Sequence, residues 1–196
     1  MAEEIYIIRH GLTESNKKKI YAGWNDECLC EEGVVTLFEI GRKLKEFKIQ
    51  RIFSSPIWRA LQSAEVINSF LNNRIEIEKN LKEMKMGRWE GLSENEVAER
   101  FPSEWKIWNS RPSELKIDGR ETLEELKIRV LNGIRRISDD LDSSRILAVT
   151  HVAIIRVLMI YYNNWALDDY RKIEVPNVAV YFLNKKELNN KIKRVL

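Results

Sequence analysis

Ile5-Tyr6-Ile7-Ile8-Arg9-His10-Gly11 is the stretch of the sequence that decides the fold. Its first four residues are apolar and mostly β-branched, and this composition predicts a short buried strand. In open α/β sheets, ligands bind outside the carboxyl ends of the strands. The guanidinium of Arg9 and the imidazole of His10 are therefore expected at the edge of the sheet where chemistry takes place.

Histidine is rare in this chain, and both of its histidines occupy the same kind of position. His10 follows the first apolar run, and His151 follows a second one, Ile146-Leu147-Ala148-Val149-Thr150. Each run predicts a buried strand. If the two strands are parallel neighbours, the two imidazoles meet at one edge of the sheet. A single histidine at a strand end is more often a plain surface or core residue, so the shared setting is what favours a functional site.

The rest of the chain alternates between predicted strands and helices. Apolar residues at three- and four-residue spacing predict helices at about 31–47, 55–71, 93–101, 122–141 and 153–161. Short apolar runs predict further strands at 51–54, 75–78, 178–183 and, at an edge of the sheet, 191–196. Ser55 and Pro56 are expected to cap and open the second helix. This alternation indicates an α/β protein with a mainly parallel sheet.

The composition indicates a soluble globular protein with a single domain, residues 1–196. Hydrophobic residues make up 44% of the chain and charged residues 32%, which excludes a disordered protein. The net charge of +3 is too small to indicate a nucleic acid partner. No apolar run is long enough for a signal peptide or a membrane span, so we expect a cytoplasmic protein without a membrane partner. Residues 79–121 are the least regular part and are expected to form a lid over the active site.

Polar residues that follow predicted strands or helix starts are expected to converge: Arg9, His10, Thr13 and Asn16, then Ser55 and Arg59, then Glu83, and finally His151. Two guanidiniums can bind an oxyanion by forked, charge-assisted hydrogen bonds, and exposed helix N-termini at Pro56 and Val152 add backbone donors. One histidine can attack phosphorus, and a carboxylic acid can protonate the leaving oxygen. The sequence shows no cluster of metal ligands, and two arginines with an imidazolium could replace the charge of a metal.

These residues make the chain resemble the histidine phosphatase superfamily, in its phosphoglycerate-mutase-like branch. The resemblance covers nearly the whole chain and rests on four motifs in the family's order. The motifs are Arg9 to Asn16 with Gly23-Trp24, Ser54 to Ala64, Leu81-Lys82-Glu83 with Gly87 to Gly91, and Thr150-His151 with Ile155-Arg156. The resemblance implies a phosphoglycerate-mutase-like fold, a three-layer α/β/α sandwich around the mainly parallel sheet.

The resemblance also implies a role for each residue of the site. His10 is expected to be the nucleophile that forms a phosphohistidine. Glu83 is expected to protonate the leaving group and then to serve as base for the attacking water. Four residues are expected to hold the phosphoryl group: Arg9, Asn16, Arg59 and His151. Three are expected to line the substrate pocket: Thr13, Gly23 and Trp24. Neither a metal nor another cofactor is expected.

Several positions depart from the family pattern. Val152 stands where a glycine usually follows the second histidine, and its β-branched side chain is expected to narrow the pocket. Cys28 and Cys30 replace a proline and a threonine, and we expect two free thiols, with Cys30 a weak helix cap. Arg120 is interpreted as a solvated charge, and Asn177 as a turn residue without a role in the site.

Three functions are compatible with these residues. The favoured one is a metal-independent phosphomonoesterase that hydrolyses a small organic phosphate ester. Its partner is this small molecule, and no nucleic acid partner is expected. The second is a cofactor-dependent phosphoglycerate mutase, but mutases of this branch are typically longer after the acid loop, which favours hydrolysis here. The third is a non-catalytic phosphate-binding protein of the same fold, and the intact site argues against it. The sequence decides neither the natural substrate nor the oligomeric state, and it is compatible with a homodimer through an edge strand or a tryptophan-bearing helix.

Overall fold

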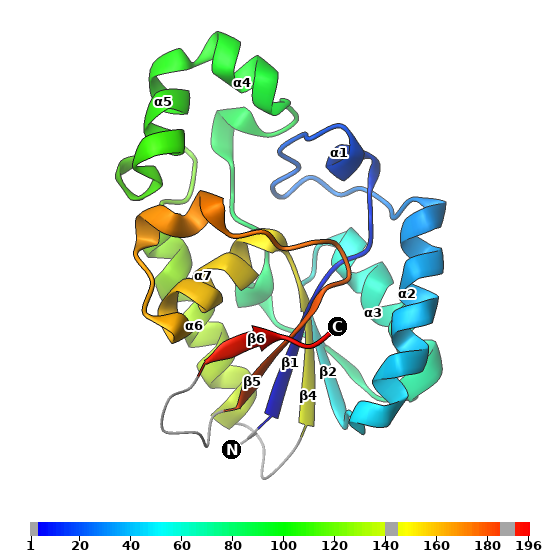
Figure 1. Ribbon diagram of the computed structural model, residues 1–196. Helices are drawn as coiled ribbons and strands as arrows, with labels where there is room; N and C mark the ends of the chain where they lie inside the picture. Colours follow the sequence, from blue (N-terminus) through cyan, green and yellow to red (C-terminus); the bar gives the residue numbers. More distant parts are fainter. Residues whose placement is uncertain (1–3, 140–144, 185–190) are drawn as a thin grey trace.

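The computed structural model describes residues 4–139, 145–184 and 191–196, and these contain a six-stranded sheet (Figure 1). Its strands, in sequence order, are β1 Glu4–Arg9, β2 Arg51–Ser54, β3 Ile75–Ile77, β4 Arg145–Thr150, β5 Val180–Asn184 and β6 Ile192–Arg194. Their order in the sheet is β3-β2-β4-β1-β5-β6. Strands β1 to β4 are parallel, and β5 is antiparallel to both of its neighbours. The predicted mainly parallel sheet and edge strand are confirmed.

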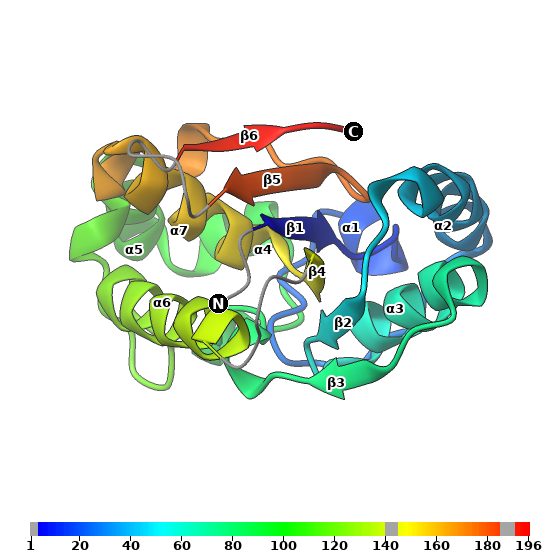
Figure 2. The ribbon, with the colours of Figure 1, turned by 90° about the horizontal axis from the view of Figure 1, so that it is seen from below.

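Helices cover both faces of the sheet (Figure 2). One face carries α2 Glu31–Leu44 and α3 Trp58–Leu71, and the other carries α6 Leu123–Asp139 and α7 Val152–Asn163. Side chains alternate along β1, so Ile5 and Ile7 pack toward one face while Tyr6 and Ile8 pack toward the other. The predicted three-layer α/β/α sandwich is confirmed. None of the helices in the described part of the chain combines the length and apolar character that a membrane span requires.

Strand β1 is buried on both faces because it lies between β4 and β5 in the middle of the sheet. This explains why its sequence is an uninterrupted apolar run. Arg9 pairs with Thr150 in the parallel ladder, so His10 and His151 leave the sheet side by side. The centres of the two imidazole rings lie 5.2 Å apart. The predicted meeting of the two histidines at one edge of the sheet is confirmed.

The start of α3 differs from the prediction. Its first residue is Trp58, and Ile57 occupies the cap position without a side-chain hydrogen bond. Ser55 does not cap the helix, because its hydroxyl accepts the N–H of Ile57 at 3.2 Å and also pairs with His151. The N–H of Trp58 donates to the carboxylate of Asp26 at 3.1 Å. This helix start is therefore not the free backbone donor that the sequence suggested.

A lobe of short helices stands over the carboxyl ends of the strands (Figure 1). It contains α4 Glu94–Arg100 and α5 Pro102–Ser110, and the predicted capping box of Ser93 and Glu96 opens α4. Helix α5 was not predicted, although Pro102 at its first turn is a start signal. Short elements complete the fold: α1 Glu14–Lys17 and 3₁₀ turns at Lys45–Phe47, Lys79–Leu81, Gly87–Trp89, Pro112–Glu114 and Leu167–Lys172. The single domain and the action of residues 79–121 as a lid stay predictions.

The first turn of α2 packs directly on the loop that follows β1. A Cβ atom on Gly33 would lie 2.4 Å from the carbonyl oxygen of Leu12 and 2.7 Å from its nitrogen. Backbone atoms cannot turn aside, so Gly33→Ala is expected to lower the free energy of unfolding by about 1–3 kcal/mol, measured by urea denaturation. Gly41→Ala in the same helix is the control, because its Cβ would meet only the side chain of Phe70. A larger loss in Gly41→Ala than in Gly33→Ala would contradict this account.

Candidate active site

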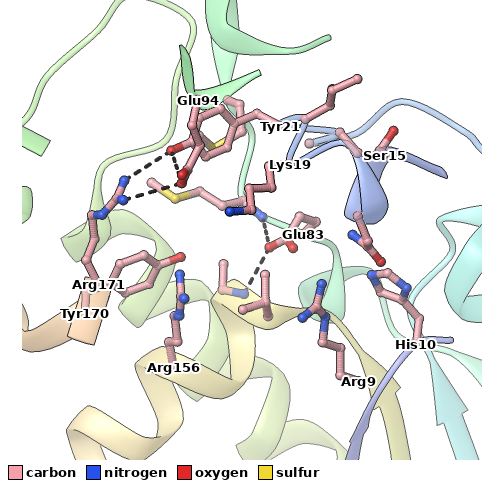
Figure 3. Close-up of a pocket in the computed structure, with 18 of the residues that line it drawn as sticks. Arg9, His10, Ser15, Lys19, Tyr21, Glu83, Glu94, Arg156, Tyr170 and Arg171 are labelled. Atoms are coloured by element: carbon pink, nitrogen blue, oxygen red, sulfur yellow. Dashed lines mark hydrogen bonds and ion pairs between the residues drawn. The ribbon is translucent and has the colours of Figure 1, made fainter. Parts of the chain in front are cut away.

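A cavity of about 570 Å³ opens at the carboxyl ends of β1 and β4 (Figure 3). Its lining includes residues from four separate parts of the chain: Arg9 and His10 at the end of β1, Arg59 in α3, Glu83 after β3, and Val152 and Ala153 at the start of α7. Parallel strands bring these parts together because their carboxyl ends meet at one edge of the sheet. The structure thus collects residues that are far apart in the sequence around one space.

The imidazole of His10 is fixed in one orientation and one tautomer. Its Nδ1 lies 2.7 Å from the carbonyl oxygen of Gly11, and because a carbonyl only accepts, Nδ1 carries the proton. The other ring nitrogen, Nε2, is therefore unprotonated, and its lone pair accepts the Nε–H of Arg59 at 3.3 Å. Burial lowers the pKa of His10 well below its usual value, and the charges of Arg59 and Arg9 lower it further. His10 is therefore neutral at physiological pH.

Two cations lie beside His10: Arg59, which is buried, and Arg9, which is partly buried. Arg59 is 1% exposed, and its guanidinium donates to the carbonyl oxygens of Asn25 at 2.9 Å and Gly23 at 2.8 Å. Arg9 donates to the carbonyl of Val175 at 2.6 Å, while its Nε has no partner among the described residues. Burial lowers the pKa of Arg9 to about 10, so it stays charged at neutral pH. Since buried cations need compensation, the pair fits a bound anion.

His151 is fully buried beside His10, with its ring centre 5.2 Å from that of His10, and it does not itself line the cavity. Its Nε2 lies 2.7 Å from the hydroxyl of Ser55, and its Nδ1 has no partner among the described residues. Burial lowers the pKa of His151 well below its usual value, and the charge of Arg59 and the neighbouring His10 lower it further. The expected imidazolium is therefore corrected to a neutral imidazole, because burial beside two cations disfavours a third positive charge.

The carboxyl group of Glu83 is held with its two oxygens in different settings. Oε1 accepts the backbone N–H groups of Met84 at 2.8 Å and Ala153 at 3.3 Å. Burial raises the pKa of this carboxyl group, although Arg59 and the two N–H groups oppose the shift. Because Oε1 already accepts two hydrogen bonds, a proton on Glu83 sits on Oε2.

The loop that carries Glu83 is anchored from outside the cavity. The indole Nε1 of Trp24 donates to the carbonyl oxygen of Glu83 at 2.7 Å, and Arg129 of α6 donates to the same oxygen at 3.3 Å. Arg129 also donates to the carbonyl oxygens of Asn80 and Lys82. These bonds fix the backbone of the loop and thereby the position of the carboxyl group.

Asn177 organises the loop after β1, which the sequence did not predict. Its amide nitrogen donates to the carbonyl oxygens of His10 and Gly11 and, at 2.8 Å, to Oδ1 of Asn16. With Oδ1 occupied, the NH₂ group of Asn16 is the part left to donate into the cavity, which Asn16 lines. The next residue, Val178, donates its N–H to the carbonyl of Arg9. A sequence signal for this role was the asparagine after Pro176, at a position where the family often has one.

The residues predicted for the substrate pocket lie in different places. Gly23 lines the cavity, with a φ of +51° that favours glycine. Thr13 lies outside the lining; it caps α1 through the N–H of Asn16 and donates to Glu27. Trp24 is also outside the lining and supports the Glu83 loop instead. The side chains of Thr13 and Trp24 thus hold elements of the site in place, and their contact with substrate stays a prediction.

The outer half of the cavity contains side chains that sequence reasoning missed: Lys19, Tyr21, Glu94, Arg156, Tyr170, Arg171 and Glu174. Arg171 donates to the hydroxyl of Tyr21 at 3.2 Å and lies 3.4 Å from the carboxylate of Glu94. Val152 lines the cavity beside them. Most of these residues belong to no motif, so only the folded chain identifies them.

Arg120 is buried, which corrects the interpretation of a solvated charge. It is 6% exposed, and its guanidinium carbon lies 4.3 Å from the ring centre of Trp108 and 5.4 Å from that of Trp89. Its Nε has no hydrogen-bond partner in the described part of the chain. Two aromatic faces stabilise the cation in place of water. Because Trp108 lines the cavity, this charge lies just behind the cavity wall.

Neither cysteine lines the cavity. Cys28 and Cys30 are free thiols, as predicted, and Cys30 caps α2 without a side-chain hydrogen bond. Within residues 4–139, 145–184 and 191–196, no group of three or more His, Cys, Asp or Glu side chains could hold a metal ion.

Comparison with known proteins agrees with this geometry. The family model of the histidine phosphatase superfamily (branch 1) matches residues 5–195. The uncharacterized phosphatase PhoE of Bacillus subtilis is 31% identical over 79% of this chain and 75% of its own length. A 2,3-bisphosphoglycerate-dependent phosphoglycerate mutase of Cytophaga hutchinsonii is 28% identical over 95% of this chain and 91% of its own length.

A solved structure shows the same fold. YhfR of Bacillus stearothermophilus superposes with a TM-score of 0.90 at 23% identity, over 100% of this chain and 96% of that protein. The family match and the phosphatase relative also confirm the predicted enzyme class, a histidine-type phosphatase. The chain belongs to branch 1 of the histidine phosphatase superfamily.

Proposed function

We propose that this protein hydrolyses a small organic phosphate ester through a phosphohistidine on His10, without a metal. The observation that best supports this is the state of His10, which lines the cavity: its Nδ1–H is fixed on the carbonyl of Gly11, so Nε2 is unprotonated, and only a 3.3 Å hydrogen bond from Arg59 must give way before Nε2 attacks. A neutral imidazole held in this way is a competent nucleophile toward phosphorus.

In the first step, Nε2 of His10 attacks phosphorus and the bond from phosphorus to the ester oxygen breaks. Arg9 and Arg59 hold the phosphoryl oxygens, with the NH₂ group of Asn16 as a further donor. The proton on Oε2 of Glu83 passes to the leaving oxygen, which departs as an alcohol. The step ends with a phosphohistidine and a Glu83 carboxylate.

In the second step, water attacks the phosphohistidine. The Glu83 carboxylate takes a proton from this water as the new bond to phosphorus forms, and the bond to Nε2 breaks. Inorganic phosphate leaves, His10 regains its lone pair, and Glu83 is again a carboxylic acid. The net reaction consumes one ester and one water and releases one alcohol and one phosphate.

The test is release of phosphate from p-nitrophenyl phosphate in the presence of EDTA. The proposal expects the activity to persist when divalent metals are chelated, because Arg9 and Arg59 supply the positive charge. Activity that is lost in EDTA and restored by a divalent cation would contradict the metal-independent mechanism.

The phosphoglycerate mutase stays the second candidate, because one specific observation favours it. The mutase of Cytophaga hutchinsonii is matched over 91% of its own length, so chain length alone does not separate the two functions. A mutase transfers the phosphoryl group from histidine back to substrate instead of to water. Incubation with 3-phosphoglycerate and catalytic 2,3-bisphosphoglycerate distinguishes them: a hydrolase releases phosphate, and a mutase produces 2-phosphoglycerate.

The hydroxyl of Ser55 is expected to set the tautomer of His151. Ser55 accepts the N–H of Ile57, so its own proton is free to donate to Nε2 of His151, and Nδ1 then carries a proton toward the phosphoryl group. Ser55→Ala is expected to lower kcat about 10- to 100-fold, because the tautomer is no longer fixed. Nitrogen NMR of His151 reports the tautomer directly.

Ser54→Ala is the control for Ser55, since the Ser54 hydroxyl donates only to the carbonyl of Ser55. Ser55→Thr keeps the hydroxyl and is expected to recover part of the activity. Equal kcat values and equal NMR spectra for Ser54→Ala and Ser55→Ala would overturn the assigned role.

The protonation states of His10 and Glu83 are expected to set the pH dependence of the rate. His10 must be unprotonated, and because burial lowers its pKa, this form persists below the usual range of histidine. Glu83 must be protonated in the first step, and because burial raises its pKa, the acid form persists above the usual range of glutamate. The profile of kcat/KM for an alkyl phosphate should therefore be a bell whose alkaline limb is absent in Glu83→Gln. A rate that climbs steadily toward alkaline pH would contradict these assignments.

A further inference from the structure

The outer half of the cavity carries positive charge that hydrolysis of a simple phosphate monoester does not use. Three cations line it, Lys19, Arg156 and Arg171, against two carboxylates, Glu94 and Glu174. The guanidinium of Arg171 is already engaged by Glu94 and by the hydroxyl of Tyr21. In the part of the chain that the structure describes, neither Lys19 nor Arg156 forms an ion pair. Two cations are thus left without an anionic partner at the site.

Arg156 is held in place and close to the phosphoryl site. Its Nε donates to the carbonyl of Ile173 at 2.8 Å, and its guanidinium carbon lies 5.1 Å from the ring centre of Tyr170. It lies near enough to Arg9 for its charge to contribute to the lowered pKa of Arg9. Arg156 also forms a hydrogen bond with the hydroxyl of Tyr170, and its other N–H groups can donate to an anion in the cavity.

Lys19 reaches the cavity from the opposite side, so that both side chains end in the same space (Figure 3). Its backbone is fixed: its N–H donates to the carbonyl of Asn16, and its carbonyl accepts the N–H of Glu94. The φ of Lys19 is +53°, a left-handed conformation that lysine seldom adopts. Lys19 lines the rim of the cavity with an exposed side chain, whereas Lys17 pairs with Glu14 and Glu32 outside it.

Arg120 adds to the positive potential of this region. It is a buried cation without a carboxylate partner among the described residues, and it stands behind Trp108 in the cavity wall. A low-dielectric wall transmits its charge into the cavity with little screening. A ligand that fills the outer half is therefore expected to bring negative charge of its own.

We infer that the substrate is a phosphomonoester that carries a second anionic group, a carboxylate, bound by Arg156 and Lys19. This inference rests on the proposed phosphatase function and names the class of its substrate. A carboxylate is favoured over a second phosphate because its two oxygens can be shared between Arg156 and Lys19, and because Glu174 and Glu94 would repel a dianion more strongly. The nearness of Arg156 to Arg9 requires a short spacer between ester oxygen and carboxylate.

The experiment compares pairs of substrates that differ by a carboxylate: phosphoserine with phosphoethanolamine, and 3-phosphoglycerate with glycerol 3-phosphate. The wild-type enzyme is expected to prefer the carboxylate member of each pair by about tenfold or more in kcat/KM. Lys19→Met and Arg156→Gln are each expected to reduce this preference several-fold. Lys18→Met is the matched control, because Lys18 is exposed beside Lys19 and does not line the cavity, and it should keep the full preference.

The outcomes separate this inference from the proposed function. If p-nitrophenyl phosphate is not hydrolysed, the proposed function fails. If it is hydrolysed but neither pair shows a preference, or if both variants keep the preference of the wild type, only the inferred substrate class is overturned. A preference for bisphosphates over carboxylates would also overturn it. Thermal unfolding of Arg156→Gln confirms that the variant is folded, and Lys19→Met, at an exposed side chain, carries the test independently.

Discussion

Replacing His10 by alanine is expected to lower kcat by about 10⁴-fold or more, because the reaction loses its nucleophile. His151 is the only other histidine in the chain, and it cannot take over, since its Nε2 is engaged by Ser55 and its ring lies 5.2 Å from that of His10. The measurement is phosphate release from p-nitrophenyl phosphate, together with acid-quenched trapping of labelled phosphohistidine, which should appear in the wild type and be absent in the variant.

The control for His10→Ala is binding of inorganic phosphate. Arg9 and Arg59 remain in the variant, so phosphate is expected to raise its Tm nearly as much as that of the wild type. A variant that binds phosphate but does not turn over would locate the defect in the chemical step. Unchanged activity in His10→Ala would overturn the proposed mechanism, and labelled protein in that variant would place the nucleophile elsewhere.

Replacing Glu83 by glutamine is expected to have an effect that depends on the leaving group. Glutamine keeps the acceptor for Met84 and Ala153 but cannot give a proton. For an alkyl phosphate, loss of the general acid should lower kcat about 10²- to 10⁴-fold. For p-nitrophenyl phosphate the leaving group departs without a proton, so the first step should remain fast while the second step, which needs a base, slows.

Rapid mixing of Glu83→Gln with p-nitrophenyl phosphate should therefore release a burst of about one nitrophenol per enzyme, followed by slow turnover. The alkyl ester should give no burst. Glu99→Gln, an exposed glutamate on α4, is the isosteric control and should match the wild type. Equal losses for both esters without a burst would show that Glu83 does not act as the acid.

The fold was readable from the sequence where local pattern and tertiary setting agree. Strand β1 is covered on both faces, so its four central residues are all apolar and predict a buried strand. Strand β4 is buried in the same way, and its apolar run predicts a strand for the same reason. The predicted capping box of Ser93 and Glu96 is also confirmed, because this motif depends only on two residues three positions apart. Helix α5 escaped prediction because tryptophans and charges between two prolines give little helical periodicity.

Only those residues of the site that belong to sequence motifs could be predicted. Arg9, His10, Arg59, Glu83 and His151 belong to recognisable patterns, and they lie together. Arg120 was misjudged because the two indole rings that bury it come from other segments of the chain. The part played by Asn177 depends on the antiparallel return of β5 beside β1, which no local pattern reveals. The place of Lys19 in the cavity lining was also missed, and its left-handed backbone conformation is not visible in the sequence.

The central place of β1 in the sheet has a consequence for how the chain reaches its native state. Glu4 pairs with Arg145 on one side and with Asn184 on the other. Both edges of the strand therefore form their hydrogen bonds with segments that are distant along the chain. Contacts of such large sequence separation slow folding, because a long loop must close before they form. Until then an apolar strand with two open edges is exposed to pairing with other molecules. The arrangement that brings His10 and His151 together is therefore expected to leave chains that have not yet paired β4 and β5 with β1 prone to aggregation.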